Sequence, residues 1–404
     1  MSKSMRILAI ALSLGVLAGS AGLGNARETQ TDTRGTLLIV GGGLRDDNDE
    51  VYAAFLHAMP DPRGQIVIVP VASGIPAEST AAFARNLQRR GVAVERISVA
   101  RIAVIDDPST PEDESTWREN ASSPEEIARL KGAAAIWFTG GDQSRVMEAL
   151  VHAAGSESAA LSTIRERLAE GAVIGGTSAG AAIMSSPMIL QGDAVAALTG
   201  DTSLGEELRL GRGLGFWDNV VVDQHFGQRA RLGRLATALS TVPQANMKGV
   251  GIDEDTAVLV ESGGRSGRVL GRGYVTLIDL DRRAVGELPS GAISLLKAGS
   301  AFTLDRHPAP QADNQRLKSA DRSQCGPGGV VTTTGESESA FIANRIMDET
   351  RTGNLCVMPA GLIAGPIFTF SPNENQSHAQ ADNAPGSLSE IAFSVVSIHP
   401  QERE

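Results

Sequence analysis

The sequence has little of several features that mark common protein classes. Aromatic residues make up only 4% of its 404 residues, so a core must be built from valine, isoleucine, leucine and alanine. Lysine and arginine, 36 together, are outnumbered by 47 acidic residues, which gives a net charge of −11. This charge argues against a nucleic acid or an anionic membrane as a partner, because both attract positive charge. It is compatible with attraction of basic substrates, or with a role in solubility alone.

Cysteine is scarce, and signatures of bound cofactors are missing. The two cysteines, Cys325 and Cys356, have no metal-ligand spacing around them. In an oxidising compartment they could form a disulfide, and two free thiols are the alternative. The glycine run 41–43 lacks the spacing of a dinucleotide-binding fingerprint. We therefore expect no cofactor and no metal.

The first 26 residues have the order of an export signal. Lys3 and Arg6 precede an apolar run over residues 7–19, and small residues follow up to Ala26. This order of charged, apolar and small residues is typical of a signal peptide. A single membrane anchor is the alternative, but the run is shorter than the roughly 20 residues that span a bilayer. The sequence predicts a secreted or periplasmic protein that begins near Arg27 and has no membrane span after signal removal.

Short apolar runs alternate with amphipathic segments over residues 35–247. Continuous short apolar runs are typical of strands buried on both faces of a parallel sheet. Such strands are predicted at 37–40, 65–69, 133–138, 172–175 and 219–222, and helices at 47–58, 77–90, 142–153, 157–170 and 228–240. The alternation predicts an α/β fold with a doubly wound, mainly parallel sheet and helices on both faces.

The pattern changes after residue 247. Three runs at short spacing predict edge or antiparallel strands of the same domain, at 256–260, 274–278 and 292–296. From about residue 309 the chain is polar and rich in glycine and proline. The predicted organisation is a signal peptide (1–26), a leader (27–34), an α/β domain (35–308) and an irregular C-terminal extension (309–404) of unknown fold. The extension would be a small unit held by the cysteine pair, or partly disordered.

A nucleophile motif follows the fourth predicted strand. Residues 176–180, Gly-Thr-Ser-Ala-Gly, fit the pattern G-x-S-x-G, and a short apolar segment that can form a helix comes next. Strand, tight turn and helix are the context that a nucleophile elbow requires. The start of the helix also directs free N–H groups at Ser178. We therefore interpret Ser178 as a nucleophile; the alternatives are an ordinary glycine-rich turn and a turn of this kind that binds an anion.

A serine nucleophile needs a general base, and the chain has six histidines. His225 stands out because it follows the fifth predicted strand directly, where enzymes with parallel sheets place their site residues. Ser178 and His225 thus both lie just past the carboxyl ends of predicted strands. A structural histidine is the alternative.

Two further groups of residues could serve this site. Arg229, Arg231 and Arg234 lie near the start of a predicted helix, where cations oppose the helix dipole. They therefore suggest a compensating anion, such as a substrate carboxylate or Asp223, or else they form a solvated face. The segment around Gly141 could supply half of an oxyanion hole and the N–H of Ala179 the other half. A plain turn capped by Asp142 is the alternative for that segment.

Together these segments resemble the cyanophycinase family of serine peptidases, which is related to aspartyl dipeptidases. The matching pieces, in chain order over about residues 35–306, are Val40-Gly41-Gly42-Gly43, Phe138-Thr139-Gly140-Gly141-Asp142-Gln143, Gly176-Thr177-Ser178-Ala179-Gly180-Ala181, Asp223-Gln224-His225-Phe226 with its spaced arginines, and Gly251-Ile252-Asp253-Glu254 with Thr256-Ala257. The segment at residues 223–226 is the most specific of them.

The resemblance implies a class I glutamine amidotransferase-like fold, a homodimer, and an activity. The activity would be hydrolysis of cyanophycin, a polyaspartate that carries arginine on its side-chain carboxyls, to β-aspartyl-arginine dipeptides. By resemblance, Ser178 would attack the carbonyl, His225 would transfer the proton, and Gly141 and Ala179 would hold the oxyanion. The residues implied in substrate binding are Gln143, Asp223, Gln224, Arg229, Arg231 and Arg234.

The resemblance leaves the third member of the triad open. The family is expected to place a glutamate after the counterpart of Gly192-Asp193, but alanine and valine follow here. We therefore take Asp193 as the triad acid, by analogy with aspartyl dipeptidases, with Asp201 as the alternative. Three other functions stay open: a peptidase for short aspartyl or isoaspartyl peptides, a non-catalytic binding protein on the same scaffold, and a lipase-type hydrolase that would use a late histidine such as His307.

Overall fold

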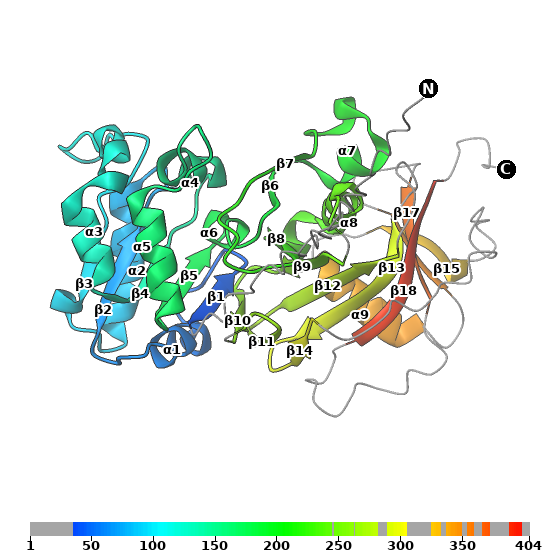
Figure 1. The fold of residues 1–404 in the computed structure, drawn as a ribbon. Coiled ribbons are helices and arrows are strands. Elements are labelled where there is room, and N and C mark those ends of the chain that lie inside the picture. Colours follow the sequence, from blue (N-terminus) through cyan, green and yellow to red (C-terminus); the bar gives the residue numbers. More distant parts are fainter. Residues whose placement is uncertain are drawn as a thin grey trace, which may run out of the picture. The chain divides into compact units, whose positions relative to one another are not determined.

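Two eight-stranded sheets contain most of the described strands (Figure 1). The computed structural model describes residues 35–244, 246–261, 263–281, 289–304, 325–332, 337–349, 354–358, 366–371 and 388–397. The predicted signal peptide and leader lie outside these residues. Among the described helices, none is both long and apolar enough to cross a membrane.

The first sheet has the strand order β14-β11-β10-β1-β5-β4-β2-β3. Its parallel part comprises β1 (Thr36–Val40), β2 (Gln65–Val69), β3 (Ile97–Val99), β4 (Ala133–Phe138) and β5 (Val173–Thr177). Three antiparallel strands continue it: β10 (Thr256–Val260), β11 (Ser266–Gly271) and β14 (Ala301–Thr303). The predicted mainly parallel arrangement and four of the five predicted buried strands are therefore confirmed in this sheet.

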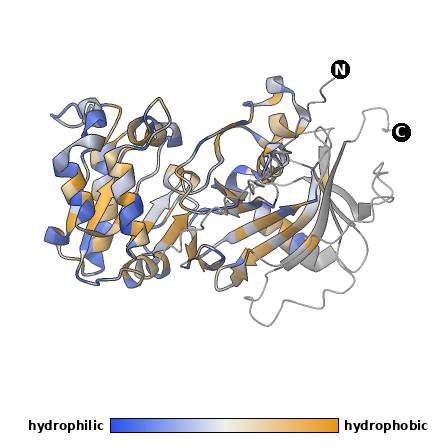
Figure 2. Ribbon diagram, in the orientation of Figure 1, coloured by the Kyte–Doolittle hydropathy of each residue, from blue (hydrophilic) through white to orange (hydrophobic). Residues whose placement is uncertain are grey.

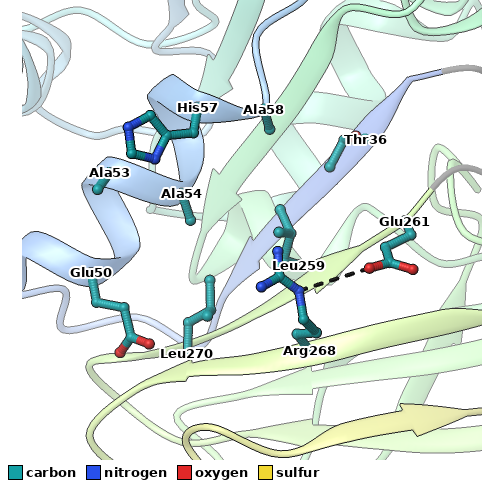
Figure 3. A pocket seen from close by; sticks show the side chains of 10 residues that line it. All are labelled: Thr36, Glu50, Ala53, Ala54, His57, Ala58, Leu259, Glu261, Arg268 and Leu270. Carbon is teal, nitrogen blue, oxygen red and sulfur yellow. Dashed lines mark ion pairs between the residues drawn. The ribbon is translucent and has the colours of Figure 1, made fainter.

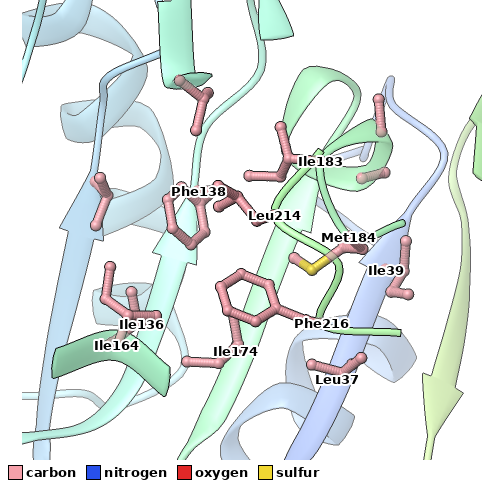
Figure 4. Close-up of a cluster of buried hydrophobic side chains, with 14 of the residues drawn as sticks. Leu37, Ile39, Ile136, Phe138, Ile164, Ile174, Ile183, Met184, Leu214 and Phe216 are labelled. Atoms are coloured by element: carbon pink, nitrogen blue, oxygen red, sulfur yellow. The ribbon is translucent and has the colours of Figure 1, made fainter. Parts of the chain in front are cut away.

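Helices cover both faces of the first sheet. Successive side chains of a strand point to opposite faces, so the residues of β1 alternate between two apolar cores. On one face, Leu38 and Val40 of β1 share an apolar core with Phe55 of α1 (Asp49–His57) and Phe83 of α2 (Pro76–Arg89). On the other face, Leu37 and Ile39 share a core with residues of α3 (Pro124–Lys131), α4 (Gln143–Leu150) and α5 (Ala159–Ala169), as Figure 4 shows for part of this cluster. In Figure 2 strands of this sheet are largely hydrophobic, whereas the helices beside them carry both hydrophobic and hydrophilic residues. The doubly wound α/β class is confirmed.

The second sheet differs from the expectation of a single sheet. Its order is β15-β16-β17-β18-β13-β12-β9-β8, and its first strand in the chain is β8 (Val220–Gln224), the fifth predicted strand. β8 pairs in parallel with β9 (Lys248–Ile252), and β12 (Tyr274–Leu280) and β13 (Ser290–Lys297) follow in antiparallel order. Val220 and Val222 of β8 share the core of the first sheet with Ile183 and Met184. This shared packing explains how β8 lies beside the turn that carries Ser178.

The C-terminal extension contributes to this second sheet. The sequence predicts an irregular segment, whereas its described residues form β15 (Cys325–Thr332), α9 (Glu338–Glu349), β16 (Asn354–Met358), β17 (Pro366–Ser371) and β18 (Leu388–Ser397). β18 pairs with β13, so the predicted boundary near residue 308 falls within one continuous sheet. The apolar runs of the extension are short and far apart, so their strands depend on a partner that only the folded chain provides. Cys325 and Cys356 lie on the neighbouring strands β15 and β16, and their pairing stays a prediction.

Candidate active site

Ser178 lies in a strained turn between β5 and the short helix α6 (Ala179–Ala182). Its φ of 55° and ψ of −112° are rare for a residue with a side chain. The two motif glycines permit this turn: a Cβ at Gly176 would lie 2.4 Å from the carbonyl oxygen of Gly180, and one at Gly180 would lie 2.6 Å from that of Phe138. The structure therefore has the sharp strand-to-helix turn that the motif predicts.

His225 lies within hydrogen-bonding distance of Ser178. The Oγ of Ser178 is 2.8 Å from Nε2 of His225, although His225 follows β8 of the second sheet. The backbone N–H of His225 donates to the carbonyl of Gly41, just past β1 of the first sheet, at 2.6 Å. A Cβ at Gly42 would lie 2.2 Å from Cε1 of the imidazole. The glycine run 41–43 thus supports the histidine, a role that the sequence alone did not suggest.

Glu254 completes a chain of three side chains. Its Oε1 lies 2.6 Å from Nδ1 of His225, and its backbone N–H donates to Oε1 of Gln228 at 2.8 Å. A carboxylate at Nδ1 favours the tautomer with the proton on that nitrogen. Nε2 is then free to accept the proton of the Ser178 hydroxyl. Glu254 comes from the turn between β9 and β10, which passes from the second sheet into the first.

Neither predicted triad acid contacts His225 in this structure. The carboxylate of Asp193 accepts a hydrogen bond from the backbone N–H of Glu206 at 2.7 Å. The carboxylate of Asp201 accepts bonds from the N–H and hydroxyl of Ser203 at 2.9 and 2.7 Å. Glu254, rather than Asp193 or Asp201, is therefore the candidate acid of the triad. The signal for Glu254 was present in the segment Gly251-Ile252-Asp253-Glu254, but the register that brings it to His225 depends on the crossover between sheets.

Burial and two arginines adjust the basicity of His225. Burial lowers its pKa below the ordinary value of 6.5, and the hydrogen bond that Nδ1–H donates to Glu254 opposes that shift. The positive charges of Arg229 and Arg231 lower the pKa further. The imidazole is therefore neutral at neutral pH, which is the form that a general base requires.

The predicted oxyanion residues flank Ser178. Gly141 has φ of +142°, and a Cβ there would lie 1.9 Å from the carbonyl oxygen of Ala72, so only glycine fits. A Cβ on the preceding Gly140 would lie 3.2 Å from Cβ of Ser178, which shows how closely this backbone passes the serine. Ala179 begins α6 directly after Ser178. Asp142 caps α4 by accepting the N–H of Ser144 at 2.8 Å, so the capping interpretation of this turn is compatible with an oxyanion role.

Three of the six predicted substrate residues are occupied by internal contacts. The amide nitrogen of Gln143 donates to the carbonyls of Ile189 and Leu190 at 3.1 and 2.6 Å. Asp223 and Arg234 form a buried pair with two hydrogen bonds of 2.8 and 2.5 Å. Burial opposes the charge of Arg234, but Asp223 outweighs it and raises the pKa of Arg234. The side chains of these three residues therefore have a structural role next to the site.

The other three predicted substrate residues lie beside the imidazole. The side-chain oxygen of Gln224 is buried and has no hydrogen-bond partner among the described residues. Arg231 donates to the carbonyl of Gln224 at 2.5 Å and lies 3.6 Å from the carboxylate of Asp223, and burial lowers its pKa to about 10. Arg229 is exposed and forms no ion pair with a described residue. Arg229 and Gln224 thus offer a donor and an acceptor to a charged ligand next to Ser178, and Arg231 adds positive charge.

A separate cavity lies away from these residues. It has a volume of about 650 Å³ and is lined by α1, β10 and β11, with His57, Glu261 and Arg268 among its side chains (Figure 3). Ser178, His225 and Glu254 are not among the residues that line it. Glu261 follows the end of β10 that pairs with the start of β1, whereas the turn at Ser178 adjoins the other end of β1, so this cavity is not the candidate active site.

Known proteins resemble the chain over this region. Residues 115–266, which include Ser178, His225 and Glu254, match the profile of peptidase family S51. A cyanophycinase of Trichormus variabilis (strain ATCC 29413 / PCC 7937) is 32% identical over 253 residues, which cover 62% of this chain and 76% of that protein. The chain belongs to peptidase family S51. A cyanophycinase of Synechococcus elongatus is 42% identical over 163 residues, which cover 40% of this chain and 47% of that protein.

Membership in family S51 confirms the predicted family and enzyme class: the chain is a serine-type peptidase. Among solved structures, a peptidase from an acI-B1 Actinobacterium aligns with 68% of this chain and 98% of its own, at 22% identity and a TM-score of 0.48.

Proposed function

We propose that this S51 peptidase hydrolyses cyanophycin to β-aspartyl-arginine dipeptides through an acyl-enzyme on Ser178. The observation that carries the proposal is the chain of contacts from Ser178 to His225 at 2.8 Å and from His225 to Glu254 at 2.6 Å. It lies inside the segment that matches family S51, and the similar proteins from Trichormus and Synechococcus are cyanophycinases.

In the first step, Oγ of Ser178 attacks the scissile carbonyl carbon while Nε2 of His225 takes the hydroxyl proton. Glu254 stabilises the imidazolium that forms, because its carboxylate accepts a hydrogen bond from Nδ1–H of His225. The tetrahedral oxyanion is held by the N–H groups of Gly141 and Ala179. His225 then gives its proton to the leaving amine, which departs and leaves an ester on Ser178.

In the second step, a water molecule attacks the ester. His225 removes one proton from the water and returns it to Oγ of Ser178 as the C–O bond breaks. The products are a free carboxylate and the regenerated enzyme. The substrate is zwitterionic, so Arg229 and Arg231 attract its carboxylates, and the free oxygen of Gln224 accepts one of its N–H groups.

The proposal is tested by incubating the protein with insoluble cyanophycin and, separately, with short isoaspartyl dipeptides. Soluble products are identified by mass spectrometry, with the Ser178→Ala variant as the blank. We expect β-aspartyl-arginine from the polymer with wild type and none with the variant. Cleavage of the short peptides alone would replace the polymer activity by the dipeptidase activity, and no cleavage of either would contradict a peptidase role on aspartyl substrates.

Export and a homodimeric state are part of the same proposal. Cyanophycin is a polymer, so an enzyme outside the cytoplasm would act on material released from other cells. The N-terminal sequence of protein recovered from the culture medium or periplasm should begin near Arg27. Light scattering on the purified protein should give twice the mass of one mature chain, and a mass of one chain would refute the dimer.

A further inference from the structure

Asp253, the neighbour of Glu254 in the chain, is a fully buried carboxylate with four hydrogen-bond donors around it. Two donors are backbone N–H groups of the α/β part of the chain, from Gly227 at 2.9 Å and Tyr274 at 3.3 Å. The other two are hydroxyls of the C-terminal extension, from Ser337 at 2.8 Å and Ser339 at 3.0 Å. A buried carboxylate depends on such donors because it has lost its contact with water. Half of the support for Asp253 thus comes from the start of α9.

Glu338, between the two serines, makes a second contact with the site. Its buried carboxylate accepts the backbone N–H of Leu232, the first residue of α8 (Leu232–Thr241), at 3.1 Å. The first N–H groups of a helix have no acceptor within the helix, so this bond satisfies one of them. α8 also carries Arg234, and Arg231 directly precedes it. Glu338 therefore fixes the position at which the arginine-bearing helix begins.

The start of α9 packs closely against the loop that follows His225. Gly227 lies two residues after His225, and a Cβ there would lie 2.0 Å from Oγ of Ser337 and 2.8 Å from Oδ1 of Asp253. Further along α9, Phe341 and Ile342 are buried in the same apolar core as Phe226, the residue that follows His225. The polar contacts of α9 with the catalytic loops are thus concentrated in its first turn, and the apolar contacts follow.

We propose that Ser337, Glu338 and Ser339, here called the α9 anchor, are positioning residues that hold His225 and Glu254 at hydrogen-bonding distance. The inference rests on the proposed function, because it takes His225 as the base and Glu254 as its partner. These two residues come from different loops. Asp253 links the loops, because its carboxylate accepts the backbone N–H of Gly227 and it precedes Glu254 in the chain. The C-terminal extension is therefore part of the support of the active site.

The test compares a double variant of the anchor with a packing variant of the same helix. Ser337→Ala/Ser339→Ala removes two of the four donors to Asp253, whereas Ile342→Val trims a buried apolar side chain that does not touch Asp253. For the double variant we expect kcat on cyanophycin to fall about 10- to 100-fold with KM within about twofold, because small displacements of reacting groups have effects of this size. Ile342→Val should keep the wild-type kcat.

A second readout does not depend on the substrate. The titration of His225 can be followed by histidine nitrogen NMR and assigned by the signal that His225→Ala removes. Because the hydrogen bond that His225 donates to Glu254 raises the pKa of His225, the double variant should titrate at lower pH than wild type. If the double variant does not fold, Ser337→Ala alone should show the same lower kcat and lower pKa of His225. Ser337→Thr, which keeps the hydroxyl, should have the wild-type values of both.

The results separate the two proposals. Wild-type kcat and wild-type titration of His225 in a folded anchor variant would overturn the inference, as would an equal loss in Ile342→Val. If wild type releases nothing from cyanophycin while the anchor variant still shifts the titration of His225, the substrate assignment fails and the anchor stands.

Discussion

Glu254 lies 2.6 Å from Nδ1 of His225, although the two residues are 29 positions apart and belong to different loops. The turn that carries Glu254 joins β9 of the second sheet to β10 of the first. His225 is held in the same place by its bond to the carbonyl of Gly41. The pair thus forms where the two sheets meet, beside the turn that carries Ser178.

Replacing the proposed acid should affect catalysis far more than replacing the acid that the sequence favoured. Glu254→Gln keeps the size of the side chain but no longer selects the productive tautomer of His225, and comparable changes reduce kcat by up to about 10⁴-fold. Because Glu254 is partly exposed, we expect a loss of about 10²- to 10⁴-fold. Asp193→Asn should stay within about threefold. Steady-state kinetics on cyanophycin decide the question, and the reverse order of the two losses would restore Asp193.

Gly42, which lies against the imidazole of His225, should not tolerate any side chain. Gly42 has φ of +105°, and its Cβ would lie 2.2 Å from the imidazole, so Gly42→Ala should displace His225 and reduce kcat by at least about 100-fold. Gly171 is a matched control, because its φ is +106° and nothing lies within 4 Å of its Cβ position. Gly171→Ala should show the backbone strain as a lower melting temperature while it keeps kcat. Equal activities of the two variants would mean that contact with the imidazole is unimportant.

Replacing Arg234 should affect the stability of the protein, whereas replacing Arg229 should affect substrate binding. Arg234 is buried against Asp223, so Arg234→Ala leaves this buried carboxylate with only Arg231, 3.6 Å away, as a cationic partner and should lower the free energy of unfolding by up to about 3–5 kcal/mol. Arg229→Ala removes an exposed charge, so the stability should change little while KM for cyanophycin rises. Urea unfolding and initial-rate kinetics on both variants check this division. A destabilised Arg229→Ala with unchanged KM would contradict it.

Stability should decrease as the pH rises through the neutral range. Burial raises the pKa of Glu338 from 4.5 to about 7. A group with a raised pKa in the folded state contributes stability that is present below its ordinary pKa and is lost as the pH rises toward the folded-state pKa. The contribution of Glu338 to the free energy of unfolding should therefore fall between about pH 5 and about pH 8, by up to about 3 kcal/mol, while the lowered pKa of His225 acts in the opposite direction below about pH 6.5.

The control for this pH dependence is Glu338→Gln, which has no titrating group. Its unfolding free energy should change less over the same range. A smaller slope should remain, because burial also raises the pKa of Asp253. Urea unfolding of both proteins at the two pH values measures the difference, and parallel pH profiles would show that Glu338 is not the source.

The sequence predicted the first sheet well because its strands are self-evident from local pattern. β1, β2, β4 and β5 are continuous apolar runs, and they are buried on both faces as such runs require. The strained turn at Ser178 also follows from local constraints, since its two flanking glycines have no room for a side chain. The position of His225 directly after a strand was sufficient to select it among six histidines.

The triad acid could not be predicted in the same way. Both Asp193 and Glu254 follow apolar segments, and only the pairing of β8 with β9 places the second one at His225. The role of the extension was equally hidden, because Ser337, Glu338 and Ser339 have no local signal and acquire their partners through contacts with residues about 85 to 110 positions earlier in the chain. Contacts of this range are set by the tertiary fold rather than by local propensity.

The most direct test of the account is the release of β-aspartyl-arginine from cyanophycin by Ser178→Ala, His225→Ala, Glu254→Gln and the triple variant. Residues that act as one unit have strongly non-additive effects. We predict that the triple variant is no less active than Ser178→Ala alone, and that both fall to the level of binding and oxyanion stabilisation without a nucleophile. Retained activity in Ser178→Ala, or losses that multiply in the triple variant, would contradict a triad of Ser178, His225 and Glu254.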